Sequence, residues 1–292
     1  MIKKYLTDFT NEFNTSLEEY IGVEENVPVV YDAMKYSLEA GGKRIRPALF
    51  DITAKLLGYK GESRECFEMA LEMIHTYSLI HDDLPAMDND TLRRGKPTNH
   101  IVFGENFAIL AGDGLLNKAY ELMLTEVCRT GDPKVARAAE YIARSAGTRG
   151  MVGGQAIDLY YEKRSAGFEI IREMHHRKTG ALLKAPIMAA CILSGATAEE
   201  MENLEAYGEA IGLAFQISDD ILDFTGEVKI LGKTTGKDLL NEKKTYVTEF
   251  GLAKAREMAA EQLEKAIEAV DSFGERAILL KELAKFIVAR DS

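Results

Sequence analysis

Two clusters of aspartates are the residues of this chain best suited to chemistry. The first runs from Asp82 to Asp88 (DDLPAMD) and the second from Asp219 to Asp223 (DDILD). Each follows an apolar stretch, where carboxylates are costly to bury unless cations or hydrogen-bond donors compensate them. Carboxylate oxygens that leave room for water and phosphate suit Mg²⁺. We therefore predict metal ions between the clusters, against the alternative of two solvated acidic helix faces.

The spacing within each cluster predicts how it is presented. Asp219 and Asp223 are four residues apart, so a regular helix places them on one face, with Asp220 beside them. Asp82 and Asp88 would point in different directions on a regular helix. Pro85 has no backbone N–H to donate, so the helix must end or distort there, and the following turn can bring Asp88 back toward Asp82. One loop and one helix then face each other across the metal ions.

Basic residues recur beside the acidic clusters, although the net charge of the chain is −11. They occupy four places: Gly41 to Pro47 (GGKRIRP), Arg93-Arg94, Lys178-Thr179-Gly180, which is expected to interrupt a helix, and Gly232 to Asp238 (GKTTGKD). Arg and Lys in glycine-containing loops suit oxyanions. His75 lies two helical turns before Asp82 and shares its face, although a buried histidine satisfied by its neighbours explains it equally well. The pattern predicts one Mg²⁺ site for a diphosphate that leaves and one cationic site for a diphosphate that stays.

Composition excludes several other classes of protein. A net charge of −11 argues against general binding to nucleic acid or to an anionic membrane, since both need a positive surface. The sequence contains no run of 18 apolar residues, so we expect no membrane span. The three cysteines are far apart and odd in number, which favours free thiols in a reducing compartment. The N-terminal residues have no apolar stretch typical of a secretion signal, so we expect a cytoplasmic protein.

The elements that must position these residues are helices. Apolar residues recur at helical spacing over 46–57 and 66–84, and Thr197 with Glu200 forms a capping box that begins the helix of the second cluster. Gly251 and Gly274 separate two further helices that reach about Arg290, and no stretch alternates convincingly as a strand. No Ser-, Pro- or Gly-rich linker divides the chain. We predict a single all-α domain over residues 1–292, with ten or more helices.

Taken together, these motifs resemble those of the trans-isoprenyl diphosphate synthases, in particular the bacterial farnesyl diphosphate synthases and their geranylgeranyl relatives. The similarity covers nearly the whole chain. It rests on Gly41 to Pro47, His75 to Thr98, Gly153-Gly154-Gln155, Lys178-Thr179-Gly180, Phe215 to Asp223, and Gly232 to Asp238. The four-residue gap between Asp83 and Asp88 is the one seen in bacterial farnesyl and plant-type geranylgeranyl enzymes.

The resemblance implies an all-helical fold around a central cavity, in a homodimer. It implies condensation of isopentenyl diphosphate with an allylic diphosphate, using Mg²⁺, with three ions when substrate is bound. Asp82, Asp88 and Asp219 would bind Mg²⁺, with Asp83, Asp220 and Asp223 binding directly or through water. Arg93, Lys178 and Lys233 would hold the allylic diphosphate, and Lys243 would add charge near the leaving group. Gly42, Lys43, Arg46, His75 and Arg94 would hold isopentenyl diphosphate, and Thr179 and Gln216 would face the developing carbocation.

The product length depends, in this resemblance, on the residues just before the first cluster. Tyr77 lies five positions before Asp82, about 7.5 Å back along a helix, between the small residues Thr76 and Ser78. An aromatic residue there accompanies farnesyl products, and a smaller one accompanies geranylgeranyl products. We therefore predict a fifteen-carbon product, against ordinary core packing of Tyr77.

Three alternatives remain open at this level: a geranylgeranyl diphosphate synthase, a class I terpene cyclase and a non-catalytic synthase subunit. A cyclase would not need the second diphosphate site, and a non-catalytic subunit should have lost aspartates or lysines that are all present here.

Overall fold

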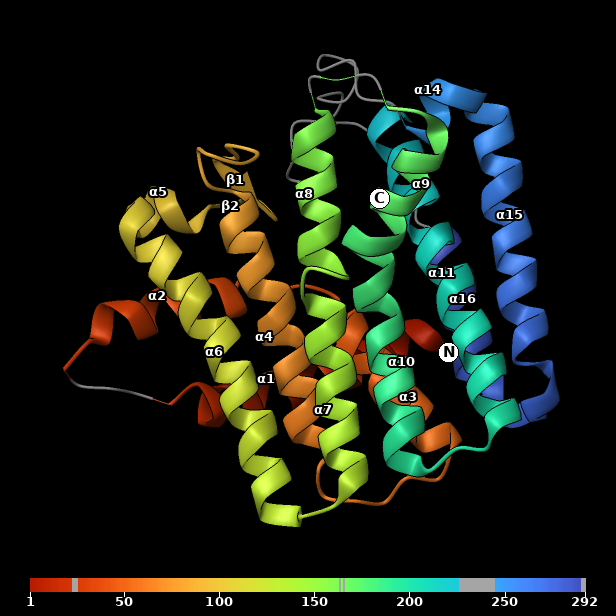
Figure 1. Cartoon of the computed structure of the whole chain (residues 1–292), viewed down its shortest axis with the longest axis horizontal. Coiled ribbons are helices and arrows are strands. Elements are labelled where there is room, and N and C mark those ends of the chain that lie inside the picture. Colours follow the sequence, from red (N-terminus) through yellow and green to blue (C-terminus); the bar gives the residue numbers. More distant parts are fainter. Residues whose placement is uncertain (23–25, 163, 165, 226–244, 290–292) are drawn as a thin grey trace.

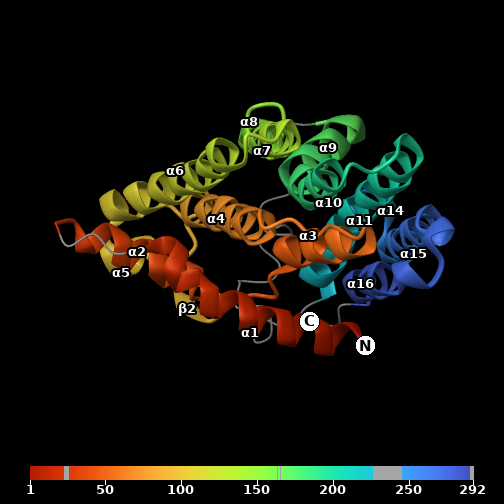
Figure 2. The ribbon, with the colours of Figure 1, turned by 90° about the horizontal axis from the view of Figure 1, so that it is seen from below.

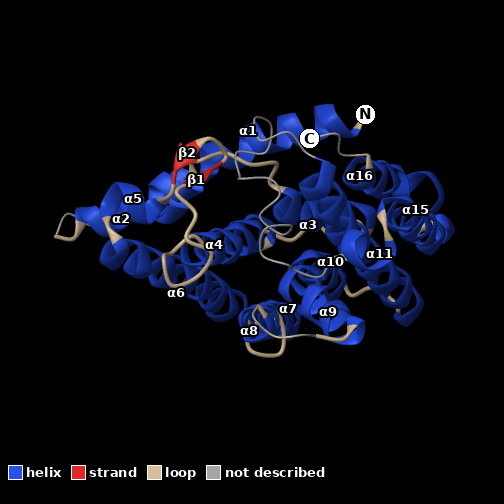
Figure 3. Cartoon of the chain, turned by 90° about the horizontal axis from the view of Figure 1, so that it is seen from above, coloured by secondary structure: helices blue, strands red, loops and turns tan. Residues whose placement is uncertain are grey.

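The computed structural model describes residues 1–22, 26–162, 164, 166–225 and 245–289, and these are almost entirely helical (Figures 1 and 3). In chain order the α-helices are α1 (Ile2–Ile21), α2 (Pro28–Leu38), α3 (Ile45–Leu56), α4 (Arg64–Asp82), α5 (Asn99–Phe103), α6 (Glu105–Thr130), α7 (Pro133–Ala146), α8 (Met151–Tyr161), α9 (Phe168–His175), α10 (Ala181–Ser194), α11 (Ala198–Thr225), α14 (Tyr246–Phe250), α15 (Leu252–Ala269) and α16 (Ile278–Val288). A π-helix, η1 (His176–Gly180), joins α9 to α10, and a 3₁₀-helix, η2 (Asp271–Ala277), precedes α16. The all-α prediction, with ten or more helices, is confirmed.

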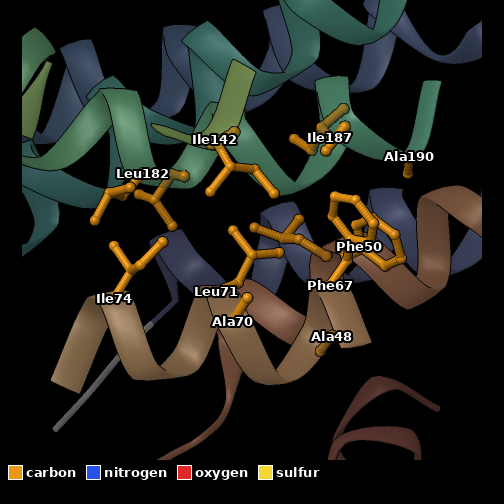
Figure 4. Packing of buried hydrophobic residues seen from close by; sticks show 14 of the residues in the cluster. Ala48, Phe50, Phe67, Ala70, Leu71, Ile74, Ile142, Leu182, Ile187 and Ala190 are labelled. Carbon is orange, nitrogen blue, oxygen red and sulfur yellow. The ribbon is translucent and has the colours of Figure 1, made fainter. Parts of the chain in front are cut away.

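Helix α4 lies inside the bundle, between α6 on one side and α3 and α10 on the other (Figure 2). Its core side chains face α7 and α10, where Leu71 and Ile74 lie opposite Ile142 and Leu182 (Figure 4). Full burial of each such side chain stabilises the fold by about 1.5–3 kcal/mol through the hydrophobic effect. This packing fixes the direction of α4 and therefore the place where the first aspartates emerge.

Helix α11 carries the second aspartate cluster, and its start is set by the predicted capping box. The Glu200 N–H donates to Thr197 Oγ1 at 3.2 Å, and the Thr197 N–H donates to Glu200 Oε2 at 2.9 Å. The helix then continues without a break to Thr225, packed along α15. The last turns of α4 and α11 lie at the same end of the bundle (Figure 1), so both aspartate clusters emerge there.

A small hairpin was not predicted. Strands β1 (Leu92–Arg93) and β2 (Lys96–Pro97) pair antiparallel around Arg94 and Gly95, whose φ angles are 53° and 76°. Two successive residues with positive φ make the tight turn that fits the twist of a two-residue hairpin. The segment is too short for an alternating pattern to show in the sequence. Its two arginines have different partners, since Arg93 contacts Asp83 and Arg94 contacts the Gly41 carbonyl.

Among the described residues, no helix is both long and apolar enough to cross a membrane. The three cysteines are free thiols, with Cys66 and Cys191 buried and Cys128 exposed.

The N-terminal part of α4 contains a buried carboxylate that makes the free energy of unfolding depend on pH. Burial, and then the negative charge of Asp51, raises the pKa of Glu68 from 4.5 to about 8, although Arg64 lies 3.4 Å from Glu68 Oε1. Between these two pH values the unfolded chain releases the Glu68 proton while the folded chain keeps it. The unfolded state then binds fewer protons, so stability must fall as pH rises.

We expect Glu68→Gln to remove most of this pH dependence, a difference on the order of 3 kcal/mol between pH 5 and pH 8. Urea unfolding followed by circular dichroism at both pH values measures it. Glu62→Gln is the matched control, because the Glu62 side chain is 84% exposed, and it should leave the wild-type slope unchanged. A Glu68→Gln protein that loses stability with pH as steeply as the wild type would contradict the assignment.

Candidate active site

The first cluster is formed by the end of α4 and a chain reversal. The helix ends at Asp82, three residues before Pro85, as expected from the missing proline N–H. The chain then folds back, with the Asp88 N–H donating to the Asp82 carbonyl at 2.9 Å and the Asp90 N–H to the Asp83 carbonyl at 3.2 Å. The predicted return of Asp88 toward Asp82 is therefore confirmed.

The side chain of Asp82 faces helix α8 and the π-helix η1. Gln155 Nε2 in α8 donates to Asp82 Oδ1 at 2.6 Å. One turn further along α8, Asp158 forms an ion pair of 2.7 Å with Lys178 of η1. Burial lowers the pKa of Lys178, but the negative charges of Asp82 and Asp158, with a smaller contribution from Asp88, outweigh it and raise the pKa. Lys178 is therefore a protonated ammonium beside the first cluster.

Asp83 points elsewhere and is engaged by an arginine. Its side chain is 4% exposed and accepts hydrogen bonds from Arg93 Nε at 2.8 Å and from Nη2 at 2.6 Å. Such a two-point contact holds both side chains in one orientation. Asp83 thus fixes the guanidinium of Arg93 at the edge of the site.

The second cluster is connected to η1 through a glutamine. Thr179 Oγ1 donates to Gln216 Oε1 at 3.1 Å, and Gln216 Nε2 donates to Asp220 Oδ1 at 2.8 Å. Asp220 is 5% exposed, whereas Asp219 and Asp223 are half-buried. The segment Lys178-Thr179 therefore contacts the surroundings of both clusters, with Lys178 on the side of Asp82 and Thr179 on the side of Gln216.

The π-helix η1 presents Lys178 and Thr179, at the place where the sequence predicted an interrupted helix. The Ala181 N–H donates to the His176 carbonyl, five residues back, which is the π-helical pattern. Helix α8 approaches η1 closely at Gly154, where an added Cβ would lie 2.2 Å from the Lys178 backbone nitrogen. Only a glycine allows this contact, which brings Asp158 to Lys178 and lets Gln155 reach Asp82.

The proposed second diphosphate site gathers around His75. Arg94 donates to the Gly41 carbonyl, and its guanidinium packs on Gly42, where an added Cβ would lie 2.5 Å from Nη1. Burial, followed by the positive charges of Arg46 and Arg94, lowers the pKa of His75 well below 6.5. A neutral imidazole surrounded by guanidinium groups is a suitable setting for an oxyanion.

Other candidate residues are placed differently or lie beyond the described part. The Lys43 ammonium lies over the ring of Phe286 in α16, 5.1 Å from its centre, so this loop lysine is directed toward α16. Lys233 and Lys243 fall within 226–244, outside the described residues.

The backbone of both basic loops is constrained. Within the described ranges, three residues other than glycine have φ in the left-handed region: Arg44 (48°) and Arg94 (53°) in the two basic segments, and Asn89 (52°) directly after the first aspartate cluster. Such conformations persist only where the surroundings fix them. Arg44 is fixed by an ion pair of 2.7 Å with the buried Glu72 and by a hydrogen bond to the Leu38 carbonyl. This contact anchors the loop that carries Gly42 and Lys43.

Comparison with known proteins identifies the family of this chain. The family model described as polyprenyl synthetase matches residues 27–283. The chain belongs to the polyprenyl synthetase family. It is therefore a prenyltransferase of trans-prenyl chain elongation, as the sequence predicted, and its fold is the isoprenoid synthase fold.

Individual relatives carry different products in their names. The farnesyl diphosphate synthase of Geobacillus stearothermophilus is 42% identical over 99% of this chain and 98% of that protein. The geranylgeranyl diphosphate synthase of Cyanophora paradoxa is 46% identical over 91% of this chain and 89% of that protein. Among solved structures, the geranyltransferase of Legionella pneumophila superposes with a TM-score of 0.89 at 34% identity, covering 100% of this chain and 98% of that chain.

The donor set of this polyprenyl synthetase fits Mg²⁺. The two clusters offer carboxylate oxygens at one end of the bundle, which are the ligands Mg²⁺ prefers. In the described ranges, no three His, Cys, Asp or Glu side chains converge closely enough to hold an ion as they stand. Asp83 and Asp220 are buried against protein donors, whereas Asp82, Asp88, Asp219 and Asp223 are half-buried at the site. The chemistry of these four carboxylates fits the ion.

Two functional residues were missed in the sequence. Gln155 was quoted only as part of a matching stretch, and Asp158 was not named, yet they hold Asp82 and Lys178. Their spacing of three residues, directly after two glycines, places both on one helical face and is the signal that could have found them.

A cavity of about 570 Å³ lies beside η1 between α9, α11 and α15, and no aspartate of either cluster lines it.

Proposed function

We propose that this prenyltransferase makes farnesyl diphosphate, by adding isopentenyl diphosphate to dimethylallyl and then geranyl diphosphate with release of pyrophosphate. The observation that carries the fifteen-carbon product is the place of Tyr77. It is buried on α4, about 7.5 Å before Asp82 along the helix axis, on the side that packs against α6.

Tyr77 is part of an aromatic barrier between α4 and α6. Its ring contacts that of His81 edge-on, with centroids 5.8 Å apart. The His81 ring packs against α6 at Gly112, and its Nε2 lies 3.1 Å from the Ile109 carbonyl. Burial, with a smaller contribution from Tyr120 of α6, raises the pKa of Tyr77 to about 12, so the phenol is neutral. A prenyl tail extending from Asp82 between these helices would meet this barrier.

Ser78, the other residue proposed to set product length, offers little obstruction. Its hydroxyl donates to the His75 carbonyl at 2.8 Å, which keeps the small side chain against its own helix. The tail would therefore pass Ser78 and stop at Tyr77.

The test is direct. Purified protein is incubated with labelled isopentenyl diphosphate, Mg²⁺ and each allylic primer, and the dephosphorylated products are separated by chromatography. Farnesol as the main product supports the proposal. Geranylgeraniol as the main product supports the alternative of a geranylgeranyl diphosphate synthase, the activity for which several relatives are named.

Asp82, Asp88 and Asp219 would hold Mg²⁺, with Asp223 directly or through water, and the ions would neutralise the charge that develops on the leaving pyrophosphate. Lys178 would bind the same diphosphate. Arg93, whose guanidinium is held by Asp83, would lie beside this diphosphate. Arg46, His75 and Arg94 would hold isopentenyl diphosphate with its double bond toward the allylic carbon. The Gln216 and Thr179 oxygens would lie beside the cationic carbon, where their partial negative charge stabilises it.

Two separate diphosphate sites predict different kinetic effects. Arg46→Ala should raise KM for isopentenyl diphosphate about tenfold or more and change KM for geranyl diphosphate little, because one charged hydrogen bond is lost. Lys178→Ala should act mainly on the allylic substrate and on kcat. Each variant serves as the control for the other. Equal effects of both variants on both substrates would contradict separate pockets.

A homodimer is part of the same proposal. Four apolar side chains on α5 and the first turns of α6 are about half exposed: Ile101, Val102, Ile109 and Leu110. Clustered apolar side chains of this kind mark association surfaces. Light scattering should give twice the 32.4 kDa chain mass, and Leu110→Glu should shift the protein toward the monomer. A wild-type protein that is monomeric at assay concentrations would contradict it.

A further inference from the structure

Asp220 lies at the centre of a chain of hydrogen bonds that links three elements. The Tyr246 N–H, at the start of α14, donates to Asp220 Oδ2 at 2.8 Å, and Gln216 Nε2 donates to Asp220 Oδ1 at 2.8 Å. Gln216 Oε1 then accepts from Thr179 Oγ1 at 3.1 Å. The chain runs from α14 across α11 to η1.

The direction of these bonds follows from the chemistry of the groups. An ionised carboxylate can only accept, so the Gln216 NH₂ must face Asp220. The Gln216 carbonyl oxygen then faces Thr179. The charge on Asp220 therefore determines which end of the Gln216 amide is presented to the reaction.

Asp220 is turned away from the other aspartates of its cluster. Gln216 and Asp220 are four residues apart and share one helical face, whereas Asp219 and Asp223 share another. The buried Asp220 carboxylate also contacts a well-fixed neighbour. Tyr246 is 1% exposed, its ring stacks on His175 with centroids 5.6 Å apart, and the Thr245 capping box holds the start of α14.

We propose that Asp220 is a positioning residue, which orients the Gln216 amide so that its oxygen faces Thr179 and the developing allylic cation. This rests on the proposed function, but not on the length of the product. An NH₂ group at the same place would present partial positive charge to the cation and raise the barrier. The role assigned to Asp220 in metal binding is replaced by this one.

Asp220→Asn tests the orientation. The oxygen of the introduced amide must remain toward the Tyr246 N–H, so its NH₂ faces Gln216, and Gln216 must turn its own NH₂ toward Thr179. We expect kcat to fall about tenfold to a hundredfold, as when one aligned dipole is lost. Binding of Mn²⁺ in the presence of pyrophosphate, followed by electron paramagnetic resonance, should stay within about twofold of the wild type, because the Asp220 oxygens bind Gln216 and the Tyr246 N–H and support no proposed metal ligand.

The exchanged pair Asp220→Asn with Gln216→Glu gives the decisive measurement. The amide introduced at position 220 can accept from Tyr246 and donate to the carboxylate introduced at position 216, whose second oxygen accepts from Thr179. The chain of hydrogen bonds is then restored with the same net charge. We expect kcat to recover well above that of either single variant, as coupled neighbours do in a double-mutant cycle. Gln216→Glu alone places two carboxylates together and should be poor.

Asp219→Asn is the matched control on the adjacent residue. It should weaken Mn²⁺ binding, and adding Gln216→Glu should not rescue it. Turnover is measured as pyrophosphate released, so the result is independent of whether the product has fifteen or twenty carbons. The proposal is overturned if the folded exchanged pair is no faster than the better single variant, or if Asp220→Asn weakens Mn²⁺ binding as much as Asp219→Asn does.

Discussion

Asp82→Ala is expected to leave the helical fold intact and to lower kcat at least about a hundredfold, as when charge stabilisation in a transition state is lost. The substitution removes a proposed Mg²⁺ ligand. It also leaves the Gln155 amide without its 2.6 Å acceptor and takes one negative charge from the surroundings of Lys178. Asp219→Ala should have a similar effect from the second cluster. Initial rates with isopentenyl and geranyl diphosphates measure both.

Glu140→Ala provides the control for removing a carboxylate from a helix. Its side chain in α7 is 63% exposed and pairs with Arg144 at 3.5 Å, so its loss should change turnover less than about twofold. Far-UV circular dichroism establishes that each variant is folded. Turnover close to that of the wild type in folded Asp82→Ala or Asp219→Ala would exclude the role proposed for that cluster.

Tyr77→Ala is expected to change the main product from fifteen to twenty carbons or more. Removing the ring opens the barrier between α4 and α6, while Asp82 and its partners remain in place, so the first condensation should be largely preserved. The cost in stability should be about 3–5 kcal/mol if the surroundings do not collapse into the space. Chromatography of the dephosphorylated products measures the shift.

Tyr77→Phe is the matched control, since it keeps the ring and removes only the hydroxyl. Its products should remain at fifteen carbons. Two results would defeat this interpretation: a wild type that already makes mainly twenty carbons, or a folded Tyr77→Ala protein whose products match those of the wild type.

Local signals in the sequence were enough for most of the fold. Pro85 ended α4, the Thr197 and Glu200 pair started α11, and the spacing of apolar residues located α3 and α4 to within about two residues. Each of these signals acts through backbone groups or side chains within one helical turn. That is why a single sequence reveals them.

The contacts that complete the site join residues far apart in the chain. Gln155 reaches Asp82 across 73 positions, and Tyr246 reaches Asp220 across 26. Such pairs depend on how α8 packs on η1 and how α14 packs on α11, which no local pattern specifies. The aspartates could be recognised from their own spacing, but which of them bind protein donors instead of metal depends on these distant partners.

The π-helix η1 has a consequence for the kinds of sequence change that this part of the chain can accept. It contains one residue more than an α-helical turn would need to join α9 to α10. Deleting any single residue within 176–180 would allow the three elements to merge into one continuous α-helix. Every residue before the deletion would then rotate by about 100° relative to α10. Lys178 and Thr179 would change their orientation relative to α9 when the deletion precedes them, or relative to α10 when it follows them, so they could no longer reach both clusters, although the deleted residue itself need have no chemical role. We therefore expect substitutions at His176 or Arg177 to be far better tolerated than a one-residue deletion, which should abolish activity while helix content is preserved.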